Sequence, residues 1–290
     1  MTGFSRSQLI TTVAAACLAT TVAVGAALAA DPVPQNDLLN ATLWVTNSVE
    51  FKANVIATYQ LAKMRLDQAL ADKTWTAATE QTGDFQDKPP AVILDADETA
   101  IDNGAYEAWL VKAGKDYSGK TWAAWVADAT AKAVPGAVDF TKYADSKGVK
   151  VFYVTNRTAD QEVATRKNME ALGFPMGGNV DTFLMSKEKE DWTSKKGTRR
   201  AFVAQNYRIL LLFGDNYGDF SDDFGGSEAD RAKSLEANMA HVGHDWIFIA
   251  NPEYGSFESA PFLLDYKKSP DERRQLKIDA MPVWANAPKG

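Results

Sequence analysis

The sequence contains very little cysteine and histidine. Its single cysteine, Cys17, lies in an apolar N-terminal stretch, and its two histidines are His241 and His244. If that stretch is removed, the mature chain has no cysteine, which excludes disulfide bonds, cysteine nucleophiles and thiolate metal sites. Neither histidine lies in an Arg-His-Gly context. We therefore interpret both histidines as structural or exposed residues.

An excess of basic residues is also missing. The 31 lysines and arginines are outnumbered by 38 aspartates and glutamates, which gives a formal net charge of −7. Because a nucleic-acid partner usually requires a basic face, this balance argues against one. The composition, 46% hydrophobic and 24% charged over 290 residues, is typical of a globular protein with a sizeable core.

The first thirty residues have the pattern of an export signal. Arg6 supplies a positive charge, an apolar Ala/Val/Leu stretch follows, and Ala27-Leu28-Ala29 forms a small-residue cleavage site. This pattern predicts a signal peptide over residues 1–30 and a periplasmic or secreted protein with no stable membrane insertion after cleavage. The alternatives are an uncleaved membrane anchor, because the apolar stretch is long, and a lipoprotein attached at Cys17. We favour cleavage over an anchor because the A-x-A site stands where a signal peptidase would cut. The lipoprotein is disfavoured because little apolar sequence precedes Cys17 and much follows it.

Short apolar runs alternate with helical patterns in the rest of the chain. The runs cover residues 91–94, 149–154, 182–185, 209–213 and 246–250. Helical patterns include 158–172, 228–239 and an N-terminal segment over about 36–72. Strands that alternate with helices predict a parallel sheet, and strands covered on both faces are continuously apolar. We predict a Rossmann-like α/β fold with an additional helical region, in a single domain over residues 31–290.

Polar residues follow several of these predicted strands. The segments are Asp95-Ala96-Asp97-Glu98-Thr99, Thr155-Asn156-Arg157 and Gly214-Asp215-Asn216-Tyr217-Gly218-Asp219, and a lysine-rich stretch, SKEKEDWTSKKGTRR, precedes the third. In open α/β sheets, ligands bind outside the carboxyl ends of the strands. We therefore expect acids, a hydroxyl group and a lysine to meet at one edge of the sheet.

The crowded carboxylates after the first strand need a compensating charge. Two like charges at about 4 Å repel by roughly 4 kcal/mol at an effective dielectric constant of 20. Carboxylates from two strand ends, without histidine or cysteine, form an all-oxygen site suited to Mg²⁺ or another divalent cation. An EF-hand would need glycine where Ala100 stands and a helix in place of the preceding strand. The sequence thus predicts a hard-cation site that also binds phosphate oxygens.

The motifs resemble those of the haloacid dehalogenase (HAD) superfamily: D-x-D-x-T, then Thr, then Lys, then G-D-x-x-x-D. More narrowly, the segments ILDADETAIDNGAY, AVPGAV, VFYVTNR, FGDNYGDF and NPEYGSFE resemble the bacterial class C acid phosphatases. The similarity extends over nearly the whole mature chain, including the helix around LWVTNSVEF. It implies a HAD-like sheet and a phosphatase acting on small phosphomonoesters, nucleotides included, and it suggests a homodimer.

The resemblance also implies catalytic roles. Asp95 would be the nucleophile that forms an aspartyl-phosphate, and Asp97 the general acid and then the general base. Thr155 and a lysine would bind the transferring phosphoryl group. Lys196 fits the family's K-x-x-R pattern best, and the alternatives are Lys187, Lys189 and Lys195.

The same resemblance implies binding residues. Mg²⁺ would be held by Asp95, the backbone carbonyl of Asp97, and Asp215, with Asp219 as a direct or outer ligand. Candidate substrate-binding residues are Asn156, Arg157, Trp122 and Tyr254. A core position for Trp122 and an ion-pair role for Arg157 are alternatives. Glu98 and Asp102 receive no role.

Two other functions are compatible with these motifs. A phosphotransferase would pass the phosphoryl group from the same intermediate to an alcohol, and the sequence does not separate transfer from hydrolysis. An exported binding protein would keep the fold without turnover. The complete set of Asp95, Asp97, Thr155, Lys196 and Asp215 argues against lost turnover. We predict a Mg²⁺-dependent acid phosphatase.

Overall fold

The predicted strands form one parallel sheet. A computed structural model describes residues 36–286 and 288, so the predicted signal peptide lies outside the described residues. Within these residues the main sheet has the order β5-β4-β1-β6-β7, with every neighbouring pair parallel. Its strands are β1 (Pro90–Leu94), β4 (Lys150–Thr158), β5 (Phe183–Ser186), β6 (Arg208–Gly214) and β7 (Trp246–Phe248). The predicted α/β fold is confirmed.

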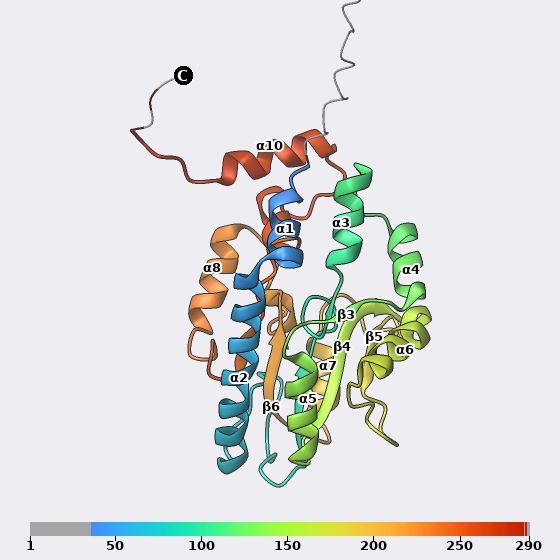
Figure 1. Cartoon of the computed structure of the whole chain (residues 1–290). Helices are drawn as coiled ribbons and strands as arrows, with labels where there is room; N and C mark the ends of the chain where they lie inside the picture. Colours follow the sequence, from blue (N-terminus) through green and yellow to red (C-terminus); the bar gives the residue numbers. More distant parts are fainter. Residues whose placement is uncertain (1–35, 287, 289–290) are drawn as a thin grey trace, which may run out of the picture. The chain divides into compact units, whose positions relative to one another are not determined.

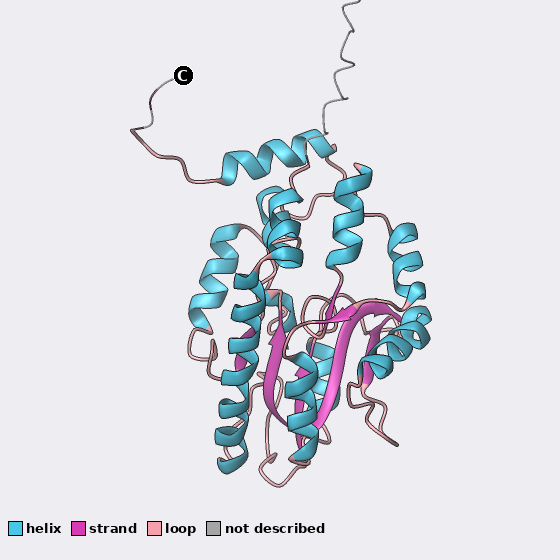
Figure 2. Cartoon of the chain, viewed as in Figure 1, coloured by secondary structure: helices cyan, strands magenta, loops and turns pink. Residues whose placement is uncertain are grey.

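Helices cover both faces of this sheet (Figures 1 and 2). One face packs against α2 (Val49–Ala71), α5 (Ala137–Ser146) and α6 (Glu162–Leu172). The opposite face packs against α7 (Gly197–Ala204) and the Trp192 side chain. Alternate residues of β1 therefore enter different clusters, as Val92 and Ile93 do, which explains the continuously apolar runs.

The N-terminal helical segment is divided at Ser48. The sequence predicts a continuous pattern there, but the structure has α1 (Leu39–Asn47) and α2, separated by Ser48 in an extended conformation. The Ser48 hydroxyl accepts the Phe51 N–H at 3.0 Å and so caps α2. Serine competes with the helix for backbone hydrogen bonds and favours helix starts, which explains the break.

The additional helical region includes the segment that follows β1. Here β2 (Ile101–Asp102) pairs antiparallel with β3 (Lys132–Ala133), and α3 (Gly104–Ala113) and α4 (Gly119–Asp128) lie between them in the chain. The remaining helical elements are η1 (Ala159–Gln161), η2 (Tyr217–Asp219), α8 (Glu228–Ala237), α9 (Ser256–Ser259), η3 (Ala260–Phe262) and α10 (Pro270–Ala280). Among the described residues, no helix is long and apolar enough to cross a membrane.

Candidate active site

The central strand β1 carries Asp95 to the carboxyl edge of the sheet. Leu94 pairs with Tyr153 of β4 and with Phe213 of β6, so Asp95 is the first residue beyond the paired part of β1. Its backbone N–H donates to the Phe213 carbonyl at 3.0 Å. The Asp95 side chain is therefore held between two neighbouring strands at the position where open α/β sheets bind ligands.

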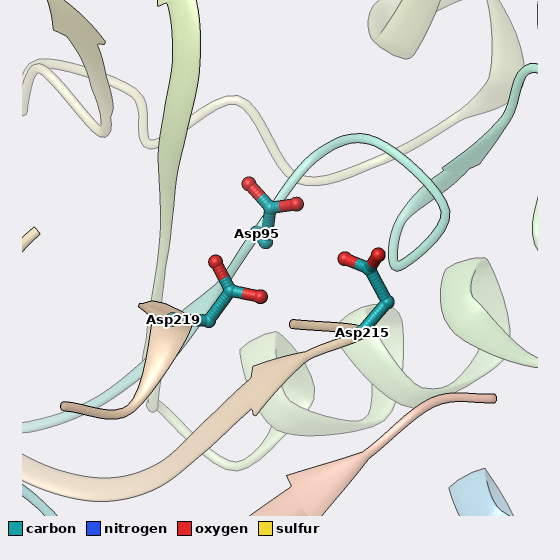
Figure 3. A group of neighbouring side chains, drawn as sticks. All are labelled: Asp95, Asp215 and Asp219. Carbon is teal, nitrogen blue, oxygen red and sulfur yellow. The ribbon is translucent and has the colours of Figure 1, made fainter. Parts of the chain in front are cut away.

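Two further acids come from the end of β6. Asp215 follows Gly214 directly, and Asp219 lies in the short helix η2. A Cβ atom at Gly214 would lie 2.3 Å from the Asp219 Cβ and Oδ2 atoms, so the backbone of β6 and the Asp219 side chain approach closely because residue 214 is glycine. Ligand oxygens of Asp95, Asp215 and Asp219 lie within 4.8 Å of one another, and Figure 3 shows their carboxylates converging.

Lys196 lies against two of these acids. Its Nζ atom is 2.5 Å from Asp95 Oδ1 and 2.6 Å from Asp219 Oδ1, and the residue is 3% exposed. The second Asp219 oxygen accepts the Asn216 N–H at 2.9 Å. Asp215 instead accepts Asn251 Nδ2 at 2.9 Å. Asp219 is thus balanced by a protein cation, while Asp215 is held by a neutral amide.

The pKa values of these groups reflect their burial. Burial raises the pKa of Asp95 to about 7, although the Lys196 ammonium lowers it. Burial also raises the pKa of Asp215 well above its ordinary value, and the Asp219 charge adds to this. Burial lowers the pKa of Lys196, but Asp219 and Asp95 more than reverse this, so the net direction is upward. The carboxylates therefore lack full compensation, and a divalent cation would supply it.

Thr155 and Asn156 stand at the carboxyl end of β4. Thr155 is buried, and its hydroxyl oxygen accepts the Arg157 N–H at 3.1 Å, which leaves the hydroxyl proton available for another acceptor. Asn156 is exposed; its Nδ2 donates to the Ser194 carbonyl, and its Oδ1 accepts Arg199 Nη2 at 2.8 Å. The polar end of β4 is therefore tied to the loop that carries the lysines.

Asp97 faces a different set of groups from Asp95. Its carboxylate accepts Arg157 Nη2 and Asn103 Nδ2, each at 2.8 Å. Arg157 also donates to the Thr165 hydroxyl at 3.1 Å. All three guanidinium nitrogens of Arg157 thus donate to protein atoms, which is the ion-pair role that the sequence left open.

Two candidate aromatic side chains lie in segments that contact the acids through other residues. Trp122 is half-buried, and its ring packs edge-on against Tyr106. The Arg157 Cζ atom lies over this ring, 5.5 Å from its centroid. Tyr254 is half-buried in the loop after β7, the loop in which Asn251 contacts Asp215. Trp122 and Tyr254 therefore keep partly accessible ring surface in segments next to the acids.

The alternative lysines point elsewhere. Lys187 and Lys195 are exposed, and Lys189 lies over the Trp192 and Phe202 rings. Both histidines contact Asp245: His241 Nδ1 lies 2.8 Å from Asp245 Oδ1, and His244 Nδ1 lies 3.2 Å from Asp245 Oδ2. Each histidine ring also stacks on a tryptophan ring. Of the four lysines considered from the sequence, the structure brings Lys196 to the acids.

The sequence interpretation missed four polar residues around the acids. They are Asn103, Arg199, Arg200 and Asn251. Arg199 Nη1 donates to the Thr155 carbonyl at 2.5 Å, and Arg200 Nη1 donates to the Asp219 carbonyl at 2.9 Å. Arg199 is the arginine of the K-x-x-R pattern, but that pattern served only to choose the lysine. A run of Lys and Arg is usually a solvated surface, so local sequence did not indicate that either arginine is buried. Asn103 did have a signal, since it lies eight residues after Asp95 in a polar segment.

Two buried glutamates lie outside this cluster. Glu107 in α3 and Glu253 after β7 are 5% and 3% exposed. Burial raises the pKa of Glu107 to about 8, with a contribution from the Glu253 charge. Burial raises the pKa of Glu253 to about 7, and the Asp102 charge adds to this. Both groups therefore keep a proton to a higher pH than an ordinary glutamate does.

We expect Glu107→Gln to weaken the pH dependence of stability. Between the ordinary glutamate pKa of about 4.3 and about 8, the folded protein keeps a proton on Glu107 that the unfolded chain releases. The free energy of unfolding therefore falls as the pH rises through this range. Glutamine mimics the protonated acid and should remove that loss, which these two pKa values put at about 3.5 kcal/mol between pH 5 and pH 8.

Urea denaturation at several pH values measures this difference. The matched control is Glu170→Gln, because Glu170 is an exposed glutamate on α6. The control should keep the pH slope of the original protein. Equal slopes for Glu107→Gln and the original protein would contradict the raised pKa of Glu107.

The fold and this arrangement define the class of protein. A parallel sheet with acids after β1 and β6, a threonine at the end of β4 and a buried lysine beside them corresponds to the HAD phosphohydrolases. A family model described as HAD superfamily, subfamily IIIB (acid phosphatase) matches residues 2–257. The chain belongs to this acid phosphatase family, and it is a phosphomonoesterase.

Solved structures agree with this assignment. The class C acid phosphatase from Bacillus anthracis is 36% identical, with a TM-score of 0.75, and the match covers 85% of this chain and 97% of that one. A second structure of that enzyme, with tungstate bound, is 37% identical with the same TM-score and coverage. The predicted resemblance to class C acid phosphatases is confirmed. Membership of this phosphatase family implies that the substrates are small-molecule phosphoesters.

Proposed function

We propose that the protein is a Mg²⁺-dependent acid phosphatase that hydrolyses phosphomonoesters through an aspartyl-phosphate on Asp95. One observation carries this proposal: Asp95 ends the central strand within 4.8 Å of two further acids and 2.5 Å from a buried lysine. A carboxylate so placed can attack phosphorus while neighbouring charges stabilise the phosphoryl oxygens.

In the first step, an Asp95 carboxylate oxygen attacks phosphorus and the bond to the leaving oxygen breaks. Asp97 gives its proton to that oxygen, so that an alcohol departs. The Lys196 ammonium and the Thr155 O–H, which can donate a hydrogen bond, stabilise negative charge on the transferring phosphoryl group. The products are an alcohol and an acyl phosphate on Asp95.

In the second step, water attacks the acyl phosphate. Asp97, now ionised, takes a proton from that water, and the bond between phosphorus and the Asp95 oxygen breaks. Inorganic phosphate leaves, Asp95 regains its carboxylate and Asp97 regains its proton. An alcohol in place of water would give the phosphotransferase that the sequence also allows.

The residues present fit a divalent cation. The donors are carboxylate oxygens from two strand ends, which is the ligand set that Mg²⁺ prefers. Asp95 and Asp215 would hold the ion with the Asp97 carbonyl, and Asp219, already paired with Lys196, would be an outer residue. A bound Mg²⁺ would neutralise charge on the phosphoryl oxygens.

The range of substrates follows from the groups near the acids. Tungstate is bound in one similar phosphatase structure, which supports binding of a phosphate-like oxyanion by this chain. We propose that Trp122 and Tyr254 contact the leaving group and that nucleotides are among the substrates, because aromatic rings stack on bases. Asn156 would contribute a polar contact. Export to the periplasm or medium and homodimer formation stay predictions.

We expect chelation to remove most of the activity. Hydrolysis of p-nitrophenyl phosphate at mildly acidic pH should fall at least about tenfold in EDTA, because the cation's charge stabilisation is worth several kcal/mol. Added Mg²⁺ should restore the rate. Unchanged turnover in EDTA would sink the proposed metal dependence, and absence of turnover with Mg²⁺ would favour the inactive binding protein.

Product ratios separate hydrolysis from transfer. Release of p-nitrophenol and of inorganic phosphate should be equal, also when an alcohol such as glycerol is added. An excess of p-nitrophenol over phosphate in glycerol would identify transfer to the alcohol. Both products come from the same reaction mixture, so enzyme concentration does not affect the ratio.

A further inference from the structure

Two neighbouring side chains fix the carboxylate of Asp97. Arg157 reaches Asp97 Oδ1 through Nη2 at 2.8 Å and Nε at 3.0 Å, and Asn103 reaches the same oxygen through Nδ2 at 2.8 Å. Arg157 is 3% exposed and Asn103 is fully buried. Charge-assisted hydrogen bonds in such buried surroundings are strong and directional, so they restrict the rotation of the Asp97 carboxylate.

The orientation of the Asn103 amide follows from its partners. Its Oδ1 faces Trp125 Nε1 at 2.8 Å and Arg157 Nη2 at 3.3 Å. Indole and guanidinium nitrogens can only donate, so this atom must be the amide oxygen. The amide nitrogen therefore faces the carboxylate oxygens of Asp97 and of Glu98, the latter at 3.2 Å.

Glu98 holds Asn103 from the other side. Besides the side-chain contact, a Glu98 carboxylate oxygen accepts the backbone N–H of Asn103 at 2.8 Å. Glu98 has φ 54°, in the left-handed region that a non-glycine residue seldom adopts. Strained backbone of this kind persists where surrounding contacts determine it, and it gathers at functional sites. The residue that the sequence left without a role thus supports Asn103.

The hydrogen bonds distinguish the two oxygens of Asp97. Among the described residues, Oδ1 accepts the three bonds from Asn103 and Arg157, whereas Oδ2 accepts Arg157 Nε at 3.2 Å. An oxygen with three donors has no capacity left for a proton. Oδ2 keeps that capacity, and the Asp97 side chain is 16% exposed.

We infer that Asn103 and Arg157 are positioning residues that make Oδ2 of Asp97 the oxygen that exchanges protons with the leaving group and water. The inference rests on the proposed acid and base role of Asp97. The proton on Oδ2 passes to the leaving oxygen as the P–O bond breaks, and Oδ2 takes a proton from the attacking water. Asn103 and Arg157 exchange no proton themselves.

Leaving-group dependence tests this inference. p-Nitrophenolate departs readily without a proton, whereas the alkoxide of an alkyl phosphate such as glycerol 3-phosphate needs one. General acid catalysis contributes about 10²- to 10⁴-fold. Asn103→Ala should therefore lower kcat/KM about thirtyfold for glycerol 3-phosphate and less than about threefold for p-nitrophenyl phosphate.

Two further variants keep the test decisive. Trp125→Phe keeps an aromatic ring but removes the indole N–H that donates to Asn103, and should shift the same substrate ratio about threefold. Asn168→Ala is the matched control, since Asn168 is also buried and donates at 2.9 Å to the Ala131 carbonyl. This control should leave the ratio unchanged. An unchanged ratio in both Asn103→Ala and Trp125→Phe would overturn the inference.

Asp97→Asn separates this failure from failure of the proposed function. It should lower kcat/KM far more for glycerol 3-phosphate than for p-nitrophenyl phosphate, and kcat/KM leaves out the later attack by water, which is common to both substrates. If it does so while Asn103→Ala lowers both substrates equally, the positioning role is wrong and the acid role stands. If Asp97→Asn affects both substrates equally, the acid role itself is wrong, and the inference fails with it.

Discussion

Replacing Asp95 with asparagine is expected to lower kcat for p-nitrophenyl phosphate by at least about a thousandfold. The change removes the anionic oxygen that attacks phosphorus and replaces it with an amide of almost the same shape. Asp95 is 8% exposed, and its backbone N–H is fixed by the Phe213 carbonyl. Asp215 and Asp219 come from the end of β6, so neither can take the place of Asp95 without rearrangement of that segment.

The fold should survive this substitution. Burial raises the pKa of Asp95 to about 7, so the charged form is unfavourable in the metal-free protein. A neutral amide avoids that cost but gives up the contact with the Lys196 ammonium at 2.5 Å. Because these effects oppose each other, thermal unfolding without metal should change little, and lost activity would report lost chemistry.

Asp102→Asn is the matched control for Asp95→Asn. Asp102 belongs to the same acid-rich segment, and its Oδ1 accepts the Gly104 N–H at 2.7 Å, which an asparagine oxygen can also do. This control should keep its rate within about threefold. Full activity in Asp95→Asn would contradict the assigned nucleophile.

Detection of the intermediate gives an independent check. Asp97→Asn should slow attack by water, so acid quenching during turnover should yield protein carrying one phosphoryl group. Peptide mass spectrometry should locate that group on Asp95. Phosphorylation of another residue would contradict the proposed mechanism even if Asp95→Asn is inactive.

The sheet and its ligand-binding edge were predictable from local sequence. Runs such as 209–213 are continuously apolar because β6 is buried on both faces. Once the strands are known, the edge follows, since residues after parallel strands meet there. Asp95 and Asp215 could therefore be brought together from sequence, and the family motifs favoured Lys196 among four candidate lysines.

The surroundings of the acids were less predictable because they depend on contacts distant in sequence. Arg199 and Arg200 follow a run of exposed lysines, yet both are fully buried and bind backbone carbonyls near Thr155 and Asp219. Arg199 donates to a carbonyl 44 residues away, and the charge of Arg200 is paired with Glu80, 120 residues away. No local pattern of hydrophobicity reports such a partner.

The choice among the lysines has a simple geometric reason. Lys196 stands at the N-cap position of α7, which starts at Gly197. Successive residues at a helix start project in different directions, so Lys195 is exposed while Lys196 is buried. The sequence shows four lysines of equal chemistry, and the start of α7 turns one of them toward the acids.

Lys196→Met is expected to lower kcat/KM about a thousandfold. The substitution keeps a long apolar side chain but removes the ammonium that lies 2.5 Å from Asp95 and 2.6 Å from Asp219. Removal of a single neutral hydrogen-bond donor from a preorganised site lowers kcat about 10²- to 10³-fold. Removal of the full positive charge of Lys196 beside the reacting phosphoryl group should cost at least as much.

The same substitution should lower stability in the absence of metal. Removing one partner of a buried ion pair leaves an uncompensated charge, which typically costs about 3 kcal/mol or more. Here two carboxylates, those of Asp95 and Asp219, lose their shared cation. Added Mg²⁺ should recover part of this stability, because a ligand that binds the folded state raises the free energy of unfolding. Thermal unfolding with and without Mg²⁺ measures both effects.

Lys195→Met is the matched control, because it makes the same change one residue earlier at an exposed side chain. Its activity and unfolding temperature should stay close to those of the original protein, since exposed charges contribute little. Lys196→Arg adds a second comparison: it restores the charge but not the compact ammonium between two carboxylates, so recovery should be partial. Equal losses in Lys195→Met and Lys196→Met would show that the charge of the whole lysine-rich segment matters, and that the buried contact of Lys196 with Asp95 does not.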